Sequence, residues 1–436
     1  MNNVARRRSK FVLVGALVAS VAIVGGASAV ASGEGSPDDI AKAKGVAPVD
    51  LTDPAIVLQR REQRFEDDLA ALIDQDSSVF AGQRVTGNTH VVYVKQGADI
   101  ASATQRVDAV AETWGMQADA ASVATAPKSE AELIDLHSRV DALLDELKTA
   151  GADICGTGPD VVLGKIQVDI EAGQAAAEKV LGDLADSVHF VPCHTTGSPD
   201  HGALTTGRYS DFPPWYGGDG IYMAGGGYCT AGFPVTKNGI RYMLISGHCV
   251  EINGINVSAA VNGVNGTWPT GYYSGSSSTY MGHSSQTEFS TNLDSSLISG
   301  SYGSRIWIGS TSTTTAWEVD TSTATEVVGN PVCHGGAVSG QQCGYTINIS
   351  PYTWHYESTT CGVKDSYLYN MAKAIGNSSG LQGGDSGAAV YHRKTSTTDA
   401  VVVHGTVSGN GCNTDLVYEP FYRTDAVFAG GGLSVP

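Results

Sequence analysis

The chain has little positive charge. Its 436 residues include 26 Lys and Arg against 44 Asp and Glu, which gives a net charge of −18. Most of the excess acid lies in residues 32–205, which hold 29 acidic and 13 basic residues, whereas residues 206–436 hold 15 and 9. A protein that binds nucleic acid needs a basic face. The composition therefore excludes nucleic acid as a partner and indicates a solvated acidic surface in the middle of the chain.

The chain also lacks the ligand spacings of common zinc sites, because neither Cys-x-x-Cys nor His-x-x-x-His occurs in it. We therefore expect no metal and no cofactor. Its eight Cys residues are instead typical of disulfides formed in an oxidising compartment.

A long apolar run occurs only near the N-terminus. It covers residues 11–24, follows four basic residues between positions 6 and 10, and leads to Ala27-Ser28-Ala29. This order is typical of a secretory signal peptide. We therefore predict a signal peptide over residues 1–29 and a secreted, extracellular product with no membrane partner after cleavage. A permanent membrane anchor is the alternative, and the small residues after the run count against it.

Residues 46–194 alternate between helical and strand patterns. Apolar residues recur at helical spacing after Asp53-Pro54, and His137 falls in another such stretch, where we expect a surface residue. The predicted helices are the run after Asp53, Ala101–Trp114, Ser129–Ala150 and Glu171–Leu184, and the predicted strands are His90–Val94, Val161–Ile170 and His189–Pro192. Strands between helices predict a small α/β or α+β domain. We place it at residues 30–205, with the boundary between 193 and 216.

Residues 206–436 nearly lack helical patterns. They hold 36 of the 54 Gly residues, and short β-like runs recur between turn signals. These runs are Tyr242–Ile245, Asp294–Ile298, Arg305–Ile308, Ala388–Tyr391 and Val401–Val407. The pattern predicts an all-β fold, either a sandwich or a barrel.

Two stretches in this region carry the parts of a nucleophilic site. Gly383-Gly384-Asp385-Ser386-Gly387 presents a serine between glycines, and Ser246-Gly247-His248-Cys249 ends an apolar run with a histidine. Serine acyl transfer needs a nucleophile, a general base and a carboxylate that orients the base. Asp294, at the start of an apolar run, is the best candidate for the carboxylate, and Asp320 and Asp365 compete with it on order alone. For the serine stretch, the alternative is a surface turn.

Together these stretches resemble the chymotrypsin-like serine proteases, and most of all the secreted bacterial branch of streptogrisins and α-lytic protease. Further matching segments are Gly217–Tyr222, Cys229–Phe233, Val332–Gly344 and Val407–Gly409. The likeness implies a chymotrypsin-like double β-barrel catalytic domain over residues 206–436. The smaller α/β (α+β) domain before it would be a propeptide.

The resemblance also implies residue roles. His248 would be the general base, Asp294 its orienting carboxylate and Ser386 the nucleophile. The backbone N–H groups of Gly384 and Ser386 would form the oxyanion hole, and Asp385 would be held internally in a structural role.

Substrate binding follows from the same likeness. Ser408, Gly409 and Asn410 would bind the substrate, and Ser408 would also support Asp294 from behind. In trypsin-like members the acid at the base of the pocket lies six residues before the serine, where this chain has Gly380. Val407 stands where glutamate-cutting members of the bacterial branch have a histidine. These differences point to a neutral or apolar residue before the cleaved bond. We interpret His404 as a packed strand histidine.

The family's disulfides imply two pairs in this chain, Cys229 with Cys249 and Cys333 with Cys343. Cys361 and Cys412 would pair near the specificity pocket, although Cys361 lies 25 residues before Ser386, which is farther than in the family. Cys155 and Cys193 are left to the propeptide. The pairing of these last four Cys residues stays open.

The predicted function is that of a monomeric, secreted serine endopeptidase made as a zymogen. Its partners would be protein or peptide substrates and its own propeptide, which would assist folding and inhibit the enzyme. The alternative is an inactive homologue that serves as a secreted binding or adhesion module. A carbohydrate-binding β-sandwich would fit the composition and leave the catalytic pattern unexplained. An α/β-hydrolase is disfavoured because Ser386 lacks the Gly-x-Ser-x-Gly turn.

Overall fold

The structure is a computed structural model. It describes residues 41–194, 208, 211–223, 228–252, 255–256, 272–274, 279–358, 363–376, 381–393 and 398–436. The predicted signal peptide over residues 1–29 lies outside the described residues. Within the described part of the chain, no helix has both the length and the apolar character needed to cross a membrane. We call residues 41–194 the N-terminal region and residues 208–436 the C-terminal region.

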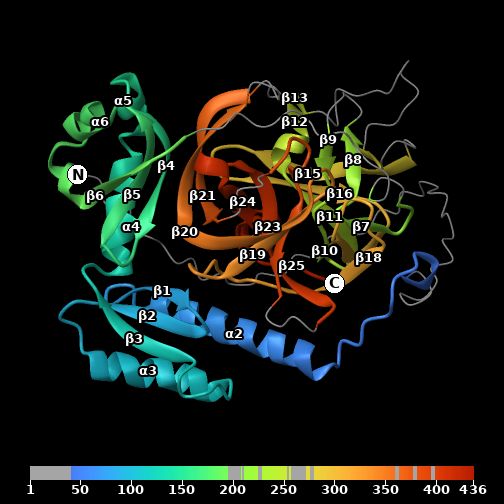
Figure 1. The fold of residues 1–436 in the computed structure, drawn as a ribbon, viewed down its shortest axis with the longest axis horizontal. Helices are drawn as coiled ribbons and strands as arrows, with labels where there is room; N and C mark the ends of the chain where they lie inside the picture. Colours follow the sequence, from blue (N-terminus) through green and yellow to red (C-terminus); the bar gives the residue numbers. More distant parts are fainter. Residues whose placement is uncertain are drawn as a thin grey trace, which may run out of the picture. The chain divides into compact units, whose positions relative to one another are not determined.

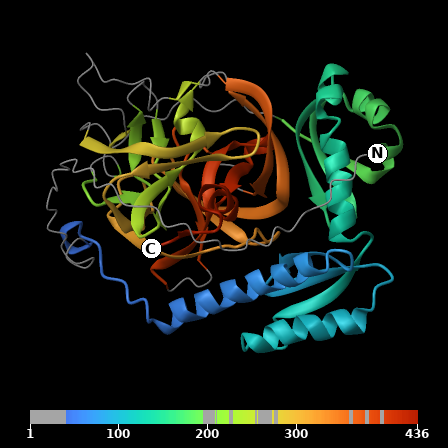
Figure 2. The ribbon, with the colours of Figure 1, turned by 180° about the vertical axis from the view of Figure 1, so that it is seen from behind.

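The N-terminal region begins with a three-stranded sheet and two helices (Figures 1 and 2). In chain order these are α2 (Pro54–Gln75), β1 (Phe80–Thr86), β2 (Thr89–Lys95), α3 (Ile100–Thr113) and β3 (Ala121–Ala126). Asp53 caps α2 by accepting a 2.7 Å hydrogen bond from the Ala55 N–H, as expected of an acid before Pro at a helix start. Phe65, Val92 and Val107 belong to the apolar core between these elements.

The second half of the N-terminal region is also mixed. It contains α4 (Glu130–Asp141), α5 (Leu144–Thr149), β4 (Asp153–Asp160), β5 (Lys165–Ala172), α6 (Gln174–Leu181) and β6 (Val188–Pro192). Three predictions were wrong in detail. One is the helix predicted over Glu171–Leu184, which begins at Gln174 because Glu171 and Ala172 end β5. The helix predicted over Ser129–Ala150 divides after Asp141, and residues 161–164 form the turn between β4 and β5 instead of strand.

The prediction that His137 is a surface residue was also wrong. It is 7% exposed, and its Nε2 lies 3.0 Å from Thr157 Oγ1. The residue faces β4 because α4 packs its apolar side, with Leu133 and Leu136, against the sheet. Burial lowers the pKa of His137, although Asp141 raises it.

The C-terminal region is built almost wholly of strands, which confirms the predicted all-β fold class. One eight-stranded sheet has the order β25-β10-β11-β16-β15-β14-β8-β9. Its strands are β8 (Gly220–Met223), β9 (Tyr228–Thr230), β10 (Phe233–Lys237), β11 (Ile240–Ile245), β14 (Tyr272–Ser274), β15 (Thr279–Phe289), β16 (Asp294–Ser299) and β25 (Leu433–Ser434). A short hairpin, β12 (Glu251–Ile252) with β13 (Ile255–Asn256), stands apart from it.

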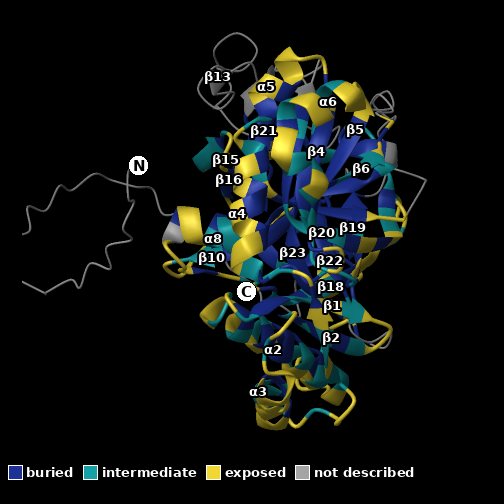
Figure 3. Cartoon of the chain, turned by 90° about the vertical axis from the view of Figure 1, so that its left-hand side faces the viewer, coloured by how far each residue is buried: buried dark blue, intermediate teal, exposed yellow. Residues whose placement is uncertain are grey.

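A second sheet carries the remaining strands of the C-terminal region. They are β7 (Trp215–Gly217), β17 (Tyr302–Ile308), β18 (Thr315–Ser322), β19 (Pro331–Gly336), β20 (Gly340–Ser358), β21 (Val363–Ile375), β22 (Ala389–His392), β23 (Ala400–Asn410) and β24 (Leu416–Pro420), followed by helix α8 (Phe421–Ala429). Strands β22 and β23 are buried along most of their length (Figure 3). Such apolar runs are typical of strands covered on both faces.

The N-terminal region joins this second sheet through β4. The sheet continues from β20 to β4, β5 and β6, with Thr353 opposite Thr157 and Trp354 opposite Gly156 (Figure 1). Gly156 permits the approach, since a Cβ there would lie 2.1 Å from the Tyr352 hydroxyl. The long hairpin of β20 and β21 is therefore shared between the two regions.

A buried polar cluster centred on Asp169 fastens this junction. Asp169 Oδ2 accepts hydrogen bonds from the Tyr352 hydroxyl at 2.8 Å and from Lys373 Nζ at 2.5 Å. Asp169 and Lys373 are 1% and 2% exposed. A buried charge needs such partners, because its removal from water is costly.

We predict that Asp169→Asn strongly destabilises the full-length chain. The substitution removes one charge of a buried pair and leaves the Lys373 ammonium under-compensated, which costs about 3–5 kcal/mol. Urea unfolding followed by circular dichroism measures the change. Asp153→Asn, at an exposed position of the neighbouring strand β4, is the control. Equal midpoints for the two variants would contradict the prediction.

Candidate active site

The pairing of β11 with β16 brings His248 to Asp294. Strand β11 leads into a short 3₁₀ turn over Gly247–Cys249, and Asp294 is the first residue of β16. The two strands are antiparallel, with Ile245 opposite Ser296. Gly247 allows the close turn, since a Cβ there would lie 2.2 Å from the Glu288 carbonyl oxygen.

Asp294 holds both the ring and the backbone of His248. The imidazole Nδ1 lies 2.9 Å from Asp294 Oδ2, and the His248 backbone N–H donates to Asp294 Oδ1 at 2.8 Å. The side chains are 4% and 0% exposed. A carboxylate at Nδ1 favours the tautomer with its proton on that nitrogen and leaves Nε2 to accept a proton. The pair therefore has the geometry of a general base and its orienting acid.

The two competing aspartates take part in other contacts. Asp320 forms a double hydrogen bond with the Arg60 guanidinium. Asp365 bonds to His355 Nε2 at 2.7 Å and pairs with Lys148. Asp294 is therefore the carboxylate that meets His248.

The Ser386 stretch is a tight loop held by its own aspartate. Asp385 Oδ1 accepts from the backbone N–H groups of Val338 and Ser339, both at 3.1 Å, and Oδ2 accepts from that of Gln382 at 2.9 Å. Gly384 has a φ of +104°, which favours glycine over other residues. Asp385 is fully buried, so its carboxylate holds the loop in place and does not contact solvent.

Backbone contacts bring this loop to the His248 turn. The Thr230 N–H donates to the Ser386 carbonyl at 2.8 Å, and the Thr230 hydroxyl donates to the Gly384 carbonyl at 2.8 Å. The Ser386 carbonyl also lies 3.8 Å from Cys249 Sγ, beside His248. Among the described residues no hydrogen bond joins the Ser386 hydroxyl to His248. Catalytic hydrogen bonds are often long in ligand-free structures and tighten when substrate binds.

Aromatic rings surround His248. The ring centroids of Phe289 and Tyr356 lie 5.9 and 5.8 Å from that of the imidazole, and Trp354 packs edge-on to Tyr356 at 5.1 Å. Trp354 and Tyr356 come from β20, the strand that pairs with the N-terminal region. Sequence reasoning missed these rings, because nothing in the local pattern links β20 to His248.

A second acid lies behind Asp294, and it was also missed. Glu419 Oε2 accepts from the Asp294 backbone N–H at 3.0 Å, and Glu419 Oε1 accepts from Arg423 Nη1 at 2.7 Å. Burial raises the pKa of Glu419 to about 8, although Arg423 lowers it. The predicted support by Ser408 is not formed, since its hydroxyl has no hydrogen-bond partner among the described residues. Ser408 sits where the register between β23 and β24 shifts, and Glu419 of β24 occupies the supporting place.

The proposed substrate-binding segment ends strand β23. Gly409 lies under Trp354, where a Cβ would come within 2.7 Å of the indole. The Asn410 side-chain amide donates to the Leu381 carbonyl at 3.4 Å, which ties the segment to the start of the Ser386 loop. Gly380 lies outside the described residues.

The cysteines depart in part from the expected pairing. Cys229 is joined to Cys249 and Cys333 to Cys343, as the resemblance implied. Cys412, however, is joined to Cys193 of the N-terminal region, with their Cα atoms 5.1 Å apart. The sulfur of Cys155 also contacts that of Cys193, and the Cα atoms of these two residues are 7.0 Å apart. The end of β6 brings Cys193 against Cys412, and Cys361, its expected partner, lies outside the described residues.

His404 is a core residue, in keeping with its interpretation as a packed strand histidine. It is fully buried in β23, and its Nδ1 lies 2.6 Å from Glu326 Oε2. Its Nε2 lies 2.5 Å from His392 Nδ1, and the Tyr418 hydroxyl donates to Glu326 at 2.7 Å. These hydrogen bonds let the C-terminal region bury several polar groups at low cost.

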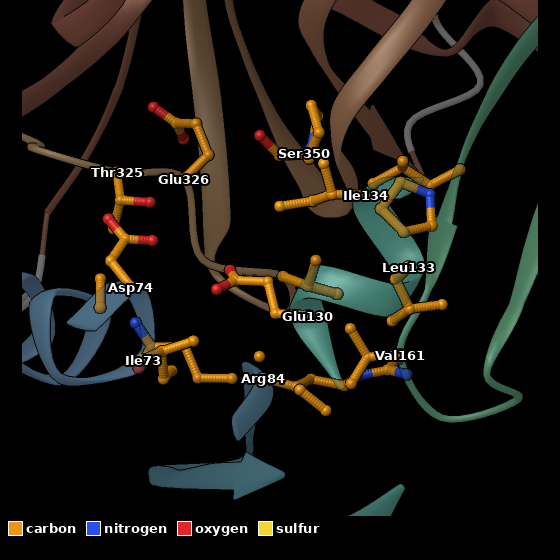
Figure 4. Close-up of a pocket in the computed structure, with 18 of the residues that line it drawn as sticks. Ile73, Asp74, Arg84, Glu130, Leu133, Ile134, Val161, Thr325, Glu326 and Ser350 are labelled. Atoms are coloured by element: carbon orange, nitrogen blue, oxygen red, sulfur yellow. The ribbon is translucent and has the colours of Figure 1, made fainter. Parts of the chain in front are cut away.

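A cavity of about 590 Å³ contains none of the predicted catalytic residues (Figure 4). Asp74 of α2 and Glu130 of α4 line it from the N-terminal region, and Glu326 and Ser350 line it from the C-terminal region. Burial, with the nearby charge of Asp74, raises the pKa of Glu130 to about 7. The cavity belongs to the junction of the two regions rather than to the His248 site.

Comparison with known proteins agrees with the residues that meet here. No family model matches the chain. Serine protease 1 of Streptomyces fradiae is 28% identical over 205 residues, which are 47% of this chain and 48% of that protein. Glutamyl endopeptidase 2 of Streptomyces griseus is 28% identical over 211 residues, 47% of this chain and 92% of that protein. The chain is similar to the bacterial chymotrypsin-like serine proteases.

Streptogrisin-C of Streptomyces griseus is a third such protease, 28% identical over 43% of this chain and 38% of that protein. The chain thus spans less than half the length of two of these relatives. Among solved structures, a glutamic acid-specific serine protease is 25% identical with a TM-score of 0.38, covering 51% of this chain and 100% of that one. Nocardiopsis protease is 19% identical with a TM-score of 0.36, covering 50% and 97%. Because these TM-scores are low, the likeness to this family rests on the sequence relatives and the motifs.

We predict that Glu419→Gln makes the stability of the chain less dependent on pH. The pKa of about 8 in the folded chain lies above the ordinary glutamate value of 4.5 expected for the unfolded chain, so the folded state binds more protons between these values. The free energy of unfolding of the wild type should therefore fall as the pH rises between these two values, from about 5 to about 8. The neutral amide keeps one of the two acceptor oxygens and removes this pH dependence.

Urea unfolding of both chains at the two ends of that pH range measures the difference. The control is Glu288→Gln, which removes a half-exposed carboxyl near the same site. If Glu419→Gln and wild type lose stability in parallel as the pH rises, Glu419 is not the group responsible.

Proposed function

We propose that the chain is the precursor of a secreted serine endopeptidase that hydrolyses peptide bonds through His248, Asp294 and Ser386. The observation that carries the proposal is the buried contact between His248 Nδ1 and Asp294, 2.9 Å long, beside the Ser386 loop. The names of the three Streptomyces relatives, all proteases or peptidases, support it.

In the proposed mechanism, Ser386 Oγ attacks the carbonyl carbon of the scissile bond. His248 Nε2 takes the hydroxyl proton and later gives it to the leaving amine, while Asp294 stabilises the imidazolium. A water then cleaves the acyl-enzyme by the same route. The N–H groups of Gly384 and Ser386 would bind the oxyanion, and each such donor contributes about 3–4 kcal/mol in comparable sites.

The substrate would be an extended protein or peptide segment lying along the end of β23. Ser408, Gly409 and Asn410 would contact it. This segment follows Val407, whose carbonyl accepts from the Ser246 hydroxyl just before the His248 turn. Asn410 bonds to Leu381 at the start of the Ser386 loop. The indole of Trp354 over Gly409 supports a neutral or apolar residue before the cleaved bond. We propose that the mature enzyme acts as a monomer.

The N-terminal region would be a propeptide that assists folding. It pairs through β4 with β20, and β20 supplies the rings of Trp354 and Tyr356 beside His248. A glycine-rich region of mostly non-local strand pairs folds slowly. A partner that orders the β20–β21 hairpin would lower the free-energy barrier to folding.

The same region would also inhibit the enzyme. Cys193, near its end, is joined to Cys412, which lies two residues after Asn410. The end of the propeptide therefore lies beside the proposed substrate segment, where it would hinder access.

We place the maturation cleavage between His194 and Arg208. Arg208 is 1% exposed, and its guanidinium donates to the carbonyls of Gly335 and Gly309, both at 2.9 Å. Its backbone N–H donates to the Thr311 carbonyl at 2.9 Å. A residue bound in this way belongs to the C-terminal region, so the chain is expected to be cut before it.

Fluorophosphonate labelling tests the proposed reaction. The secreted protein should gain one adduct, on Ser386, because an oriented base activates this hydroxyl alone. Ser386→Ala should gain none, and the exposed Ser310→Ala should label like wild type. Intact mass after reduction of disulfides measures the adduct, and peptide mapping places it.

The mass of the labelled chain also tests the boundary, which should lie between residues 194 and 208. A processed, folded protein with no adduct would contradict the enzyme and favour the binding-module alternative. A first residue after Arg208 would contradict the proposed cleavage site.

A further inference from the structure

The ammonium group of Lys44 lies in a closed pocket of the C-terminal region. Its side chain is 1% exposed, as is that of Asp211, with which it forms an ion pair. Lys44 Nζ also donates to the Phe212 carbonyl at 2.5 Å. Lysine is almost never buried so completely unless it is paired, so this contact requires a specific receptor.

Three aromatic rings form the walls of that receptor. Lys44 Nζ lies 4.1 Å from the ring centroid of Phe212, 4.6 Å from that of Tyr216 and 5.9 Å from that of Trp307. All three lie within the range in which a cation is attracted to a ring face. We call Asp211, Phe212, Tyr216 and Trp307 the ammonium cage.

The carboxylate of the cage is positioned by the C-terminal region itself. Asp211 Oδ1 accepts from the Phe212 N–H at 2.8 Å, and Oδ2 accepts from the Tyr216 N–H at 3.0 Å and Trp307 Nε1 at 3.2 Å. None of these donors belongs to the N-terminal region. The site is therefore built before Lys44 enters it, and without a cation it leaves a buried carboxylate with its charge uncompensated.

The segment around Lys44 shows how a peptide reaches the cage. Val46 is 6% exposed and packs in the same cluster as Tyr216 and Trp307. Arg305 Nη1 donates to the Ala47 carbonyl at 2.7 Å. The C-terminal region thus contacts a lysine side chain, an apolar residue two positions later and the backbone carbonyl that follows.

We propose that the ammonium cage is a binding site for a lysine side chain, occupied by Lys44 in the precursor and vacated on maturation. The empty cage then binds a lysine side chain of a protein substrate. This lysine lies away from the cleaved bond in the substrate sequence. This second step rests on the proposed function, since the cage opens only when the segment around Lys44 leaves it, which the disulfide between Cys193 and Cys412 does not prevent. Binding at the cage gives the enzyme a preference for substrates that carry such a lysine, and the residues around Ser386 do not determine this preference.

The test uses the full-length Ser386→Ala chain, so that binding is measured without processing. In this background Lys44→Ala empties the cage, and Lys42→Ala, at the exposed neighbouring lysine, leaves it filled. The probe is n-butylammonium, which reproduces the lysine side chain, and n-butanol is the uncharged control. Thermal unfolding at constant ionic strength reports binding, because a ligand of the folded state raises Tm.

We expect n-butylammonium to raise the Tm of the Lys44→Ala chain in a saturable way and to leave the Lys42→Ala chain unchanged. Adding Asp211→Asn to Lys44→Ala should weaken n-butylammonium binding about tenfold, the effect of losing roughly 1.4 kcal/mol. Equal responses of the two lysine variants, or equal effects of butanol and butylammonium, would overturn the proposal. Both results are independent of whether Ser386 is a nucleophile.

Discussion

The candidate site depends on one buried carboxylate. Asp294 begins a central strand with no exposed surface, and it binds the ring and backbone of His248 while Glu419 accepts from its own N–H. A carboxylate is stable in such a place only if donors surround it. The donors here also orient the histidine, so the contacts that make the buried acid tolerable are those that prepare the imidazole to accept a proton. The position of Asp294 at the start of β16, next to the end of β11, makes both possible.

A second constraint ties this site to the N-terminal region. The long strand β20 pairs with β4 and also carries Trp354 and Tyr356 beside His248. The Asp169 cluster and the contacts of Cys193 and Lys44 fasten the two regions at separate places. Folding of the C-terminal region and access to its site are therefore coupled to the same partner. The three attachments differ in chemistry, so conditions that loosen one of them need not loosen the others.

Much of this arrangement could be predicted from the sequence, and the reasons are local. Glycines around Ser386 and an apolar run before His248 carry their own signal, and the helices and most short strands follow from hydrophobic spacing. What could not be predicted depends on contacts between distant segments. Nothing beside Glu419 in the sequence marks it as the neighbour of Asp294, and His137 looks like a surface residue until α4 packs on β4. The pairing of Cys412, which the sequence left open, depends in the same way on Cys193, which arrives from another region.

The most direct test of the account is the turnover of a peptide substrate by Asp294→Asn. The amide keeps the shape of the side chain but favours the wrong histidine tautomer, so kcat should fall about 10⁴-fold at neutral pH with little change in folding. Asp365→Asn, at an exposed aspartate that pairs with His355 and Lys148, should leave kcat within twofold of wild type, about the scatter of surface substitutions. A folded Asp294→Asn enzyme with kcat near that of wild type would show that His248 does not depend on Asp294, and the account would fail.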